Sequence, residues 1–491
     1  MAKFNQTASI RTTNKSGHAA YSMTDKAKLV TQVLTSFFDE KKFYGDNTPE
    51  MIDTVNRVIK ADPAFVAHLA VFARREFNMR SVAHVLTAML AKAPEGKPYI
   101  RAVVDGVCVR GDDATEIMSC YLSRFGKPIP NALKRGLADV LKRFDAYTLA
   151  KYKGSGKAVK MRDLLCLCHP KPANDAQAAL WKSVIDGTIQ PPVTWETELS
   201  ANGNNRETWE RLIDSNKVGY MALLRNLRNI VNAGPRNIYK VWAKIENPAA
   251  IKKSKQLPFR FLSAYKELEN AGSLALDTLE NAVDHAADNL RKIPGTTVIA
   301  VDVSGSMHNT ISANSKIRCC EIGMMLGLLA NRLCENAIFV TFNNSLNVIP
   351  VSKRSGILYA CTHEARSTGG TNMALPFNYM IKNHVQADRV LMISDNECNS
   401  RWWGANPVWW GANPVQRIAD EYRKLSGRDI WVHAVDLMGY GTQQFCGPKT
   451  NVISGWSEKV LDFIMLAEQG EDALEKRIAN YVIGAVRSSD V

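Results

Sequence analysis

The feature that most constrains the fold is a change of hydrophobic pattern at residues 293–295, Ile-Pro-Gly. Before this point, from about residue 22, apolar residues recur at helical spacing, as Leu29, Val33 and Phe37 do. After it, short apolar runs bounded by turns alternate with helical patterns. Because 491 residues are too many for one hydrophobic core, the change predicts a domain boundary.

The segment before the boundary reads as helical throughout. Its helical stretches are separated by Gly and Pro breakers, such as 126–130, 170–172 and 191–192. Antiparallel helix pairs with short polar breaks are typical of an α-solenoid of HEAT-like repeats. No strict sequence period accompanies the pattern, so the sequence predicts an all-helical domain more firmly than a regular repeat.

The segment after the boundary predicts an α/β domain. Four apolar runs are typical of buried strands: 296–303, 337–342, 388–395 and 429–437. Helical patterns lie between and after them, at 316–336, 374–385, 414–425 and 458–469. This alternation predicts a doubly wound, mostly parallel sheet, in which ligands bind at the carboxyl ends of the strands.

The net positive charge of the chain comes entirely from the helical segment. Residues 296–491 hold 18 basic and 18 acidic side chains, so the whole net charge of +14 lies in residues 1–295. The densest stretch, Arg124 to Lys171, has twelve Lys and Arg against three Asp. Such a concentration is typical of a polyanion-binding domain, although an ordinary solvated surface is the alternative.

Other features exclude several classes of protein. No run approaches the ~18 apolar residues of a membrane span, and the polar start lacks the apolar stretch of a signal peptide. The ten cysteines form no CxxC pair, which favours reduced thiols in a cytoplasmic protein. The string KGSGKA at 153–158 departs from the Walker pattern because Ala158 follows Gly-Lys, and no catalytic motif stands out. We therefore expect no enzyme activity.

A group of oxygen-bearing side chains follows the predicted strands. Asp302, Ser304 and Ser306 come at the end of the first strand, Thr371 follows a Gly-Gly turn, and Asp395 ends the third strand. Hard oxygen ligands without Cys or His suit one divalent cation, most simply Mg²⁺. The alternative is a metal that only fixes the loops.

These residues resemble the metal-ion-dependent adhesion site of von Willebrand factor A domains, over residues 295–470. The resemblance implies that the serines and Thr371 reach the metal directly or through water, with Asp302 and Asp395 as inner- or outer-sphere carboxylates. It also implies an open coordination position for an acidic oxygen of a partner. Asn372 departs from the Asp often found after the threonine.

Several phrases of the chain resemble the Ro autoantigen family, whose helical module is called TROVE. They are RDLL at 162–165, CHPKP at 168–172, MALLRNLRNI at 221–230, LPFRFLSAY at 257–265 and IPGTTVIAVDVSGSM at 293–307. The resemblance implies a ring of helical repeats closed by the A domain, in a bacterial or phage member. It implies binding of Y-type stem-loop RNAs outside the ring and of single-stranded 3′ ends of misfolded RNAs in its hole.

The RNA contacts are predicted from this resemblance and from the local charge. By resemblance, the family's RNA-contacting lysine and histidine fall on Lys151 and His169; without it, a histidine before proline is more often a structural cap. Neighbouring cations could neutralise phosphates. The predicted set is Lys134, Arg135, Lys151, Lys153, Arg162, His169 and Lys171.

Together these patterns predict a helical RNA-binding domain at 1–294, an A domain at 295–470 and a C-terminal helix at 471–491 that packs back on the ring. The expected function is a non-catalytic, monomeric RNA-binding scaffold in RNA quality control. An exoribonuclease or another protein is an expected partner at the metal site. The alternatives are an adhesion-type protein-binding scaffold and, disfavoured by its few carboxylates, a metal-dependent nuclease. The segment WWGANPV occurs twice in tandem, at 402–408 and 409–415. The repeat predicts a loop whose tryptophans contact a ligand; the alternative is a duplication tolerated in a surface loop.

Overall fold

The structure is a computed structural model of the whole chain. It describes residues 11–15, 17–35, 49–154, 156–254, 256, 258–287, 290–310, 316–352, 356–398, 414–455, 459–469 and 474–484. None of the helices in these ranges is long and apolar enough to cross a membrane.

The chain divides into two compact units, each described separately. The helical unit comprises the described parts of Asp25–Val193 and Leu474–Val491, and the sheet unit those of Met1–Thr24 and Thr194–Ala473. The pattern change at residues 293–295 therefore does not coincide with a division between units, because the helices after Val193 pack with the sheet.

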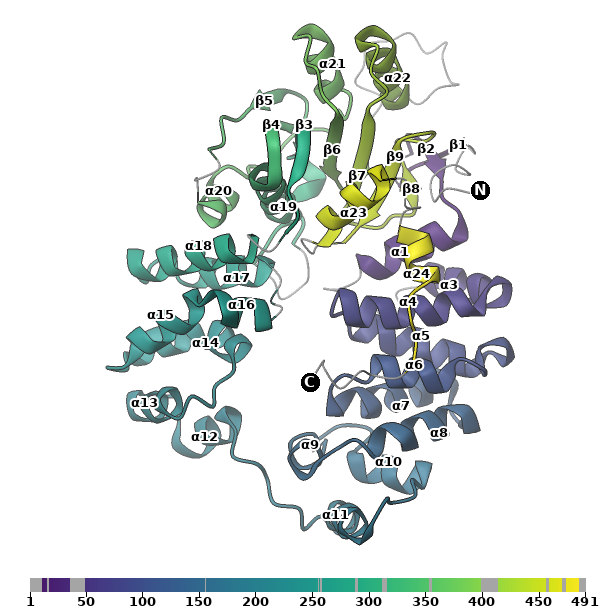
Figure 1. Ribbon diagram of the computed structural model, residues 1–491, viewed down its shortest axis with the longest axis vertical. Helices are drawn as coiled ribbons and strands as arrows, with labels where there is room; N and C mark the ends of the chain where they lie inside the picture. Colours follow the sequence, from purple (N-terminus) through teal and green to yellow (C-terminus); the bar gives the residue numbers. More distant parts are fainter. Residues whose placement is uncertain are drawn as a thin grey trace. The chain divides into compact units, whose positions relative to one another are not determined.

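The helical unit is built from packed helices, with α3 on α4, α4 on α5, α5 on α7 and α6 on α8, and Figure 1 shows them stacked from α3 to α8. Asp62 begins α4 by accepting a hydrogen bond from the Phe65 amide, ahead of a proline in the first turn. The helices are α1 (Asp25–Leu34), α3 (Pro49–Ala61), α4 (Pro63–Glu76), α5 (Ser81–Lys92), η2 (Pro94–Gly96), α6 (Ile100–Val107), α7 (Gly111–Phe125), α8 (Asn131–Leu141), α9 (Ala146–Lys151), α10 (Met161–Cys168), α11 (Asp175–Asp186) and α24 (Leu474–Ala479).

The C-terminal segment belongs to the helical unit through α24. This helix lies against α4 and buries Leu474 and Ile478. Beyond it, the Tyr481 ring meets Phe72 edge-on at 5.3 Å and its hydroxyl donates to Glu76. Both ends of the helical unit's chain, α1 and α24, thus lie together.

The sheet unit contains a second group of helices. They are α12 (Trp195–Asn202), α13 (Arg206–Asp214), α14 (Tyr220–Ala233), α15 (Ile238–Glu246), α16 (Pro248–Ser254), α17 (Pro258–Glu267) and α18 (Ser273–Ala287). Lys266 on α17 donates to both oxygens of the buried Glu321, and Arg332 pairs with Asp284 on α18. These ion pairs join α17 and α18 to the α/β part of the unit.

A six-stranded sheet forms the centre of this unit, in the order β5-β4-β3-β6-β7-β9, with β5 alone antiparallel to its neighbour. The strands are β3 (Ile293–Asp302), β4 (Cys334–Phe342), β5 (Leu346–Val348), β6 (Arg389–Ser394), β7 (Trp431–Asp436) and β9 (Thr450–Ser454). The helices are η3 (Gly305–His308), α19 (Cys319–Leu333), α20 (Ile357–His363), α21 (Leu375–Lys382), α22 (Pro414–Ser426) and α23 (Lys459–Glu468). The prediction of a helical part followed by a mostly parallel α/β domain is confirmed.

The structure adds a small sheet that the sequence pattern does not predict. In it, β1 (Arg11–Thr13) pairs with β2 (Ala19–Ser22), which pairs in turn with β8 (Thr442–Gln443). The turn between β1 and β2 lies against the segment after β6, where Asn14 donates to the Cys398 carbonyl at 3.1 Å. The first described residues therefore pack with the α/β domain, although the predicted helical domain, 1–294, includes them.

Candidate functional site

One candidate site lies at the carboxyl edge of the six-stranded sheet. Asp302 ends the central strand β3 with its side chain fully buried. One of its carboxylate oxygens accepts from the Ser304 amide at 2.8 Å, and the other accepts from the Ser394 hydroxyl at 2.7 Å. These bonds hold the Asp302 carboxylate at the strand end.

The loop after Asp302 is fixed by the loop that carries Thr371. The Gly305 amide donates to the Gly369 carbonyl at 2.8 Å, and a Cβ at Gly305 would approach that carbonyl oxygen to 3.1 Å. The hydroxyls of Ser304 and Ser306 lie 3.1 Å apart, and both Ser304 and Thr371 are buried. The structure therefore places four of the predicted metal ligands on two loops that are bonded to each other.

Asp395, the fifth predicted ligand, follows β6, the strand next to β3. It is 1% exposed, and its Oδ2 has no hydrogen-bond partner among the described residues. Asp436, which ends the adjacent strand β7, was not predicted as a ligand; it also buries an Oδ2 that has no hydrogen-bond partner in the described ranges. Its signal was available, because Asp436 ends a predicted strand at the same edge.

Burial without a cationic partner changes the acidity of these carboxyls. Burial and the nearby Asp395 raise the pKa of Asp302 to about 7, and burial raises the pKa of Asp395 as well. Burial also raises the pKa of Asp436 to about 7. Two buried carboxylates with hydroxyl oxygens beside them fit a hard divalent cation, since its charge would offset the cost of burying them. No three His, Cys, Asp or Glu side chains form a metal-binding group within the described ranges.

A second candidate site is a shallow basic groove in the helical unit, with a cavity of about 380 Å³. The residues that line it come from α6, from α8 and its flanks, and from the end of α10 with the turn that follows. They are Arg101, Asn131, Lys134, Arg135, Ala138, Asp139, Lys142, Leu167, Cys168, His169, Pro170 and Lys171. Four predicted RNA contacts thus meet in one groove: Lys134, Arg135, His169 and Lys171.

The cations of the groove outnumber its one carboxylate by five to one. Asp139 accepts from Arg101 at 2.9 Å and lies 3.9 Å from the Lys142 ammonium. No ion pair in the described part of the chain involves the three remaining cations, Lys134, Arg135 and Lys171. The groove can therefore attract an anion without first breaking an internal ion pair.

His169 has both a structural position and an exposed side chain. It ends α10 in the left-handed conformation, at φ 46°, and its amide donates to the Leu165 carbonyl. Its ring is exposed at the groove. The backbone of His169 therefore caps α10, as expected for a histidine before proline, while its imidazole stays available to a ligand.

The other three predicted RNA contacts are not among the residues that line the groove. Lys151 lies at the end of α9, with its ammonium 5.6 Å from the Tyr147 ring centroid and 5.7 Å from that of Tyr152. Lys153 and Arg162 are exposed near the start of α10. Arg101 and Lys142 line the groove but were not predicted: the packing of α6 against α8 brings Arg101 there, and Lys142 directly follows α8.

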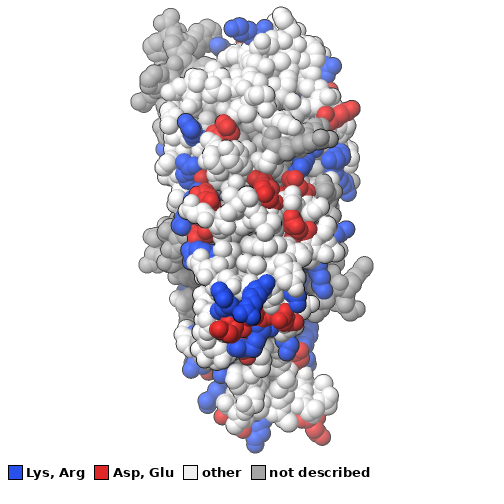
Figure 2. Space-filling view, turned by 90° about the vertical axis from the view of Figure 1, so that its left-hand side faces the viewer, with Lys and Arg blue, Asp and Glu red and all other residues white. Residues whose placement is uncertain are grey.

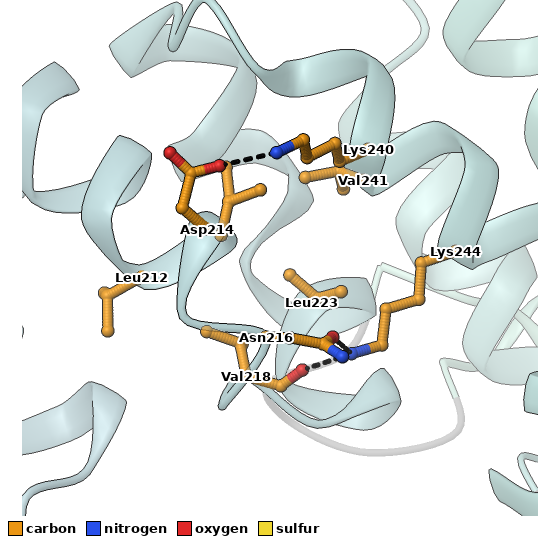
Figure 3. Close-up of a pocket in the computed structure, with 9 residues that line it drawn as sticks. Leu212, Asp214, Asn216, Val218, Leu223, Lys240, Val241 and Lys244 are labelled. Atoms are coloured by element: carbon orange, nitrogen blue, oxygen red, sulfur yellow. Dashed lines mark hydrogen bonds and ion pairs between the residues drawn. The ribbon is translucent and has the colours of Figure 1, made fainter.

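A second cavity, of about 220 Å³, lies between α13, α14 and α15 of the sheet unit. Its cations are engaged: Lys240 donates to Asp214, and Lys244 donates to the Asn216 side chain and the Val218 carbonyl (Figure 3). On the face drawn in Figure 2, basic side chains likewise lie interspersed with acidic ones. This cavity offers an anion less free charge than the groove does.

The WWGANPV repeat lies almost wholly outside the described residues.

Comparison with known protein families finds a match for each of the two parts of the chain. Residues 22–186 and 179–293 match the family described as "TROVE domain", and residues 296–407 match "Ro60 vWA domain". The RNA-binding protein RO60 of Deinococcus radiodurans is 23% identical over 447 residues, which cover 78% of this chain and 83% of that protein. Telomerase protein component 1 of Rattus norvegicus is 25% identical over 293 residues, 42% of this chain, but the match spans only 11% of that protein.

A solved structure has the same fold. The crystal structure of the Deinococcus radiodurans RO (RSR) protein aligns with a TM-score of 0.63 and 20% identity, covering 91% of this chain and all of that one. The TROVE match alone spans more than half of the chain. The chain therefore belongs to the Ro family, with a TROVE domain followed by a Ro60-type von Willebrand factor A domain.

Proposed function

We propose that this protein binds RNA through the basic groove of its helical unit. The observation that carries the proposal is a set of three cations, Lys134, Arg135 and Lys171, that have no ion-pair partner among the described residues and lie beside the exposed His169. Phosphate contacts from Lys and Arg supply most of the sequence-independent affinity for nucleic acid. A related protein named for RNA binding aligns over most of this chain, which supports the choice of polyanion.

The preferred RNA is a small Y-type stem-loop held on the groove, with single-stranded 3′ ends of misfolded RNAs as a second ligand in the hole of a ring. Resemblance to the family supports both ligands. The proposed role is that of a monomeric, non-catalytic scaffold in RNA quality control. Ten free cysteines fit the reducing cytoplasm.

We further propose that the sheet edge holds one divalent cation, most simply Mg²⁺. Asp302, Asp395, Ser304, Ser306 and Thr371 would hold it, and the unpartnered Asp395 Oδ2 is the observation that favours it. When bound, the cation would supply an open position for an acidic oxygen of a partner. An exoribonuclease or another protein is the proposed partner there, so protein binding is the second candidate function.

The groove is tested by removing its three unpaired cations together. The variant Lys134→Gln, Arg135→Gln, Lys171→Gln should bind a stem-loop RNA about tenfold or more weakly in gel shifts at fixed salt. The matched control, Lys60→Gln, Lys97→Gln, Lys182→Gln, removes the same charge from exposed positions of the same unit. Equal losses in both variants would mean that net charge alone attracts the RNA, and the groove would lose its role.

A further inference from the structure

Outside the groove, the helical unit carries a row of alternating aromatic and cationic side chains. The row runs from Tyr147 and Lys151 on α9 to Tyr152, which ends that helix, and on to Arg110, which precedes α7. The Lys151 ammonium contacts both tyrosine rings, and the Arg110 guanidinium lies 5.5 Å from the Tyr152 ring centroid. We call these four residues the stacking row.

The stacking row is held rigidly at one end and open at the other. Tyr152 packs on Gly111, where an added Cβ would come within 2.6 Å of the ring. Arg110 is fixed by a two-pronged pairing with Asp112, at 3.1 and 3.2 Å. Tyr147 is 50% exposed, and its hydroxyl accepts from Lys151 at 3.5 Å. The exposed ring is therefore positioned without being covered.

Such a row has the chemistry of a single-strand binding surface. Unpaired bases stack on aromatic side chains in a sequence-tolerant way, while Lys and Arg beside them meet the phosphates. The base faces of a duplex are already covered by their neighbours, so a stem offers an exposed tyrosine nothing to stack on. Lys153, exposed directly after Tyr152, adds a further cation for the backbone.

We propose that the stacking row binds unpaired bases of RNA, with Tyr147 as the stacking residue and Lys151 as the cation that orients it. The proposal rests on the proposed RNA binding and adds to it a site that selects single strands. The groove and the stacking row then divide the ligand by structure: phosphates of a folded stem-loop in the groove, and exposed bases on Tyr147.

The test measures binding of fluorescent oligouridine and of a stem-loop, with a loop too short to expose unstacked bases, to the full-length protein by anisotropy. Tyr147→Ala should bind oligouridine about five- to tenfold more weakly and the stem-loop as the unsubstituted protein does. Tyr147→Phe keeps the ring and should stay within about twofold for both RNAs. The matched control is Tyr359→Ala, which removes an equally exposed tyrosine that stacks on His363 in the sheet unit.

The outcomes separate this proposal from the proposed function. Stem-loop binding that persists while Tyr147→Ala leaves oligouridine affinity unchanged would overturn the stacking row alone. An equal loss for both RNAs, or an equal loss in Tyr359→Ala, would overturn it too, because selection for unpaired bases would be absent. A protein that binds neither RNA before substitution would remove the proposed function and the stacking row together.

Discussion

The groove of the helical unit and the carboxyl edge of the sheet are opposite in charge but alike in one respect. In the groove, Lys134, Arg135 and Lys171 lack acidic partners in the described part of the chain. At the sheet edge, Asp395 and Asp436 each bury a carboxylate oxygen to which no described residue donates. By contrast, Lys266 and the buried Glu321 form an ion pair at 2.8 Å.

In this protein, charged groups without partners mark the places where ligands are expected to bind. A buried charge without a partner costs free energy that a ligand of opposite charge can recover, whereas an exposed cation without a partner stays hydrated and can pair with an incoming anion. The exposed cations of the groove suit a large polyanion that approaches from solvent. The buried carboxylates of the edge suit a small cation that fits between loops. The two sites should therefore act independently.

The largest expected effect concerns the metal. Asp302→Asn removes one of the two carboxylates proposed as ligands, so affinity for Mn²⁺, measured by calorimetric titration of the full-length protein, should fall by at least about a hundredfold. Mg²⁺ should raise the melting temperature of the unsubstituted protein but not of the variant. The control Asp429→Asn removes an exposed carboxylate of the same unit. Undiminished Mn²⁺ binding in Asp302→Asn would end the metal proposal.

A buried carboxylate that does have partners sharpens the comparison. Glu468 accepts from Arg389 at 2.6 and 2.8 Å and contacts His433 at 3.0 Å. Glu468→Gln leaves the 5%-exposed Arg389 without its counter-charge, and should lower the free energy of unfolding by about 3 kcal/mol near neutral pH. Urea unfolding measures this, with the exposed Glu421→Gln as control. A loss no larger than the control's would show that the pair adds nothing.

The same group predicts how stability depends on pH. Although burial opposes it, hydrogen bonding to His433 and Arg389 lowers the pKa of Glu468 from 4.5 to about 2, so its contribution is lost as pH falls from about 4.5 to 2. Burial lowers the pKa of His433 below 6.5, so as the pH falls the unfolded chain binds a proton on this histidine before the folded protein does. The free energy of unfolding therefore also decreases as the pH drops below about 6.5. Glu468→Gln should remove the lower part of this dependence and extend the upper part to lower pH, because the variant lacks the carboxylate that favours protonated His433. Identical pH profiles for both proteins would contradict this assignment.

The smallest expected effect concerns the imidazole of His169. Asn tolerates the left-handed backbone at this position better than most residues, so His169→Asn removes the ring while keeping the cap. One lost hydrogen bond to RNA should weaken stem-loop binding about fivefold, with little change for heparin. Gel shifts with both polyanions decide. An equal change for the two would leave His169 with its structural role only.

The parts of the fold that the sequence predicts are those set by local patterns. The central strands β3, β4, β6 and β7 are continuous apolar runs, as strands buried on both faces must be. By contrast, β9 has the short, partly polar sequence TNVIS, and the short strand β2 pairs on one side with β1 and on the other with β8, more than 400 residues away.

The candidate sites divide in the same way. Asp302, Ser304 and Ser306 lie on one turn, so spacing alone groups them. Arg101 reaches the groove only through the packing of α6 on α8, which no local pattern encodes, whereas Lys142 directly follows α8 itself. The stacking row also depends on packing, because Gly111 and Tyr152 meet across two helices.

The salt dependence of stem-loop binding tests the central claim most directly. With five or six phosphates contacted, the logarithm of the affinity should fall against the logarithm of salt with a slope of about −4 to −5. The variant Lys134→Gln, Arg135→Gln, Lys171→Gln should lose about 2 to 3 from the magnitude of that slope, while Asp302→Asn should follow the unsubstituted protein. A flat dependence, or a slope that Asp302→Asn changes as much as the groove variant does, would contradict two independent sites of opposite charge.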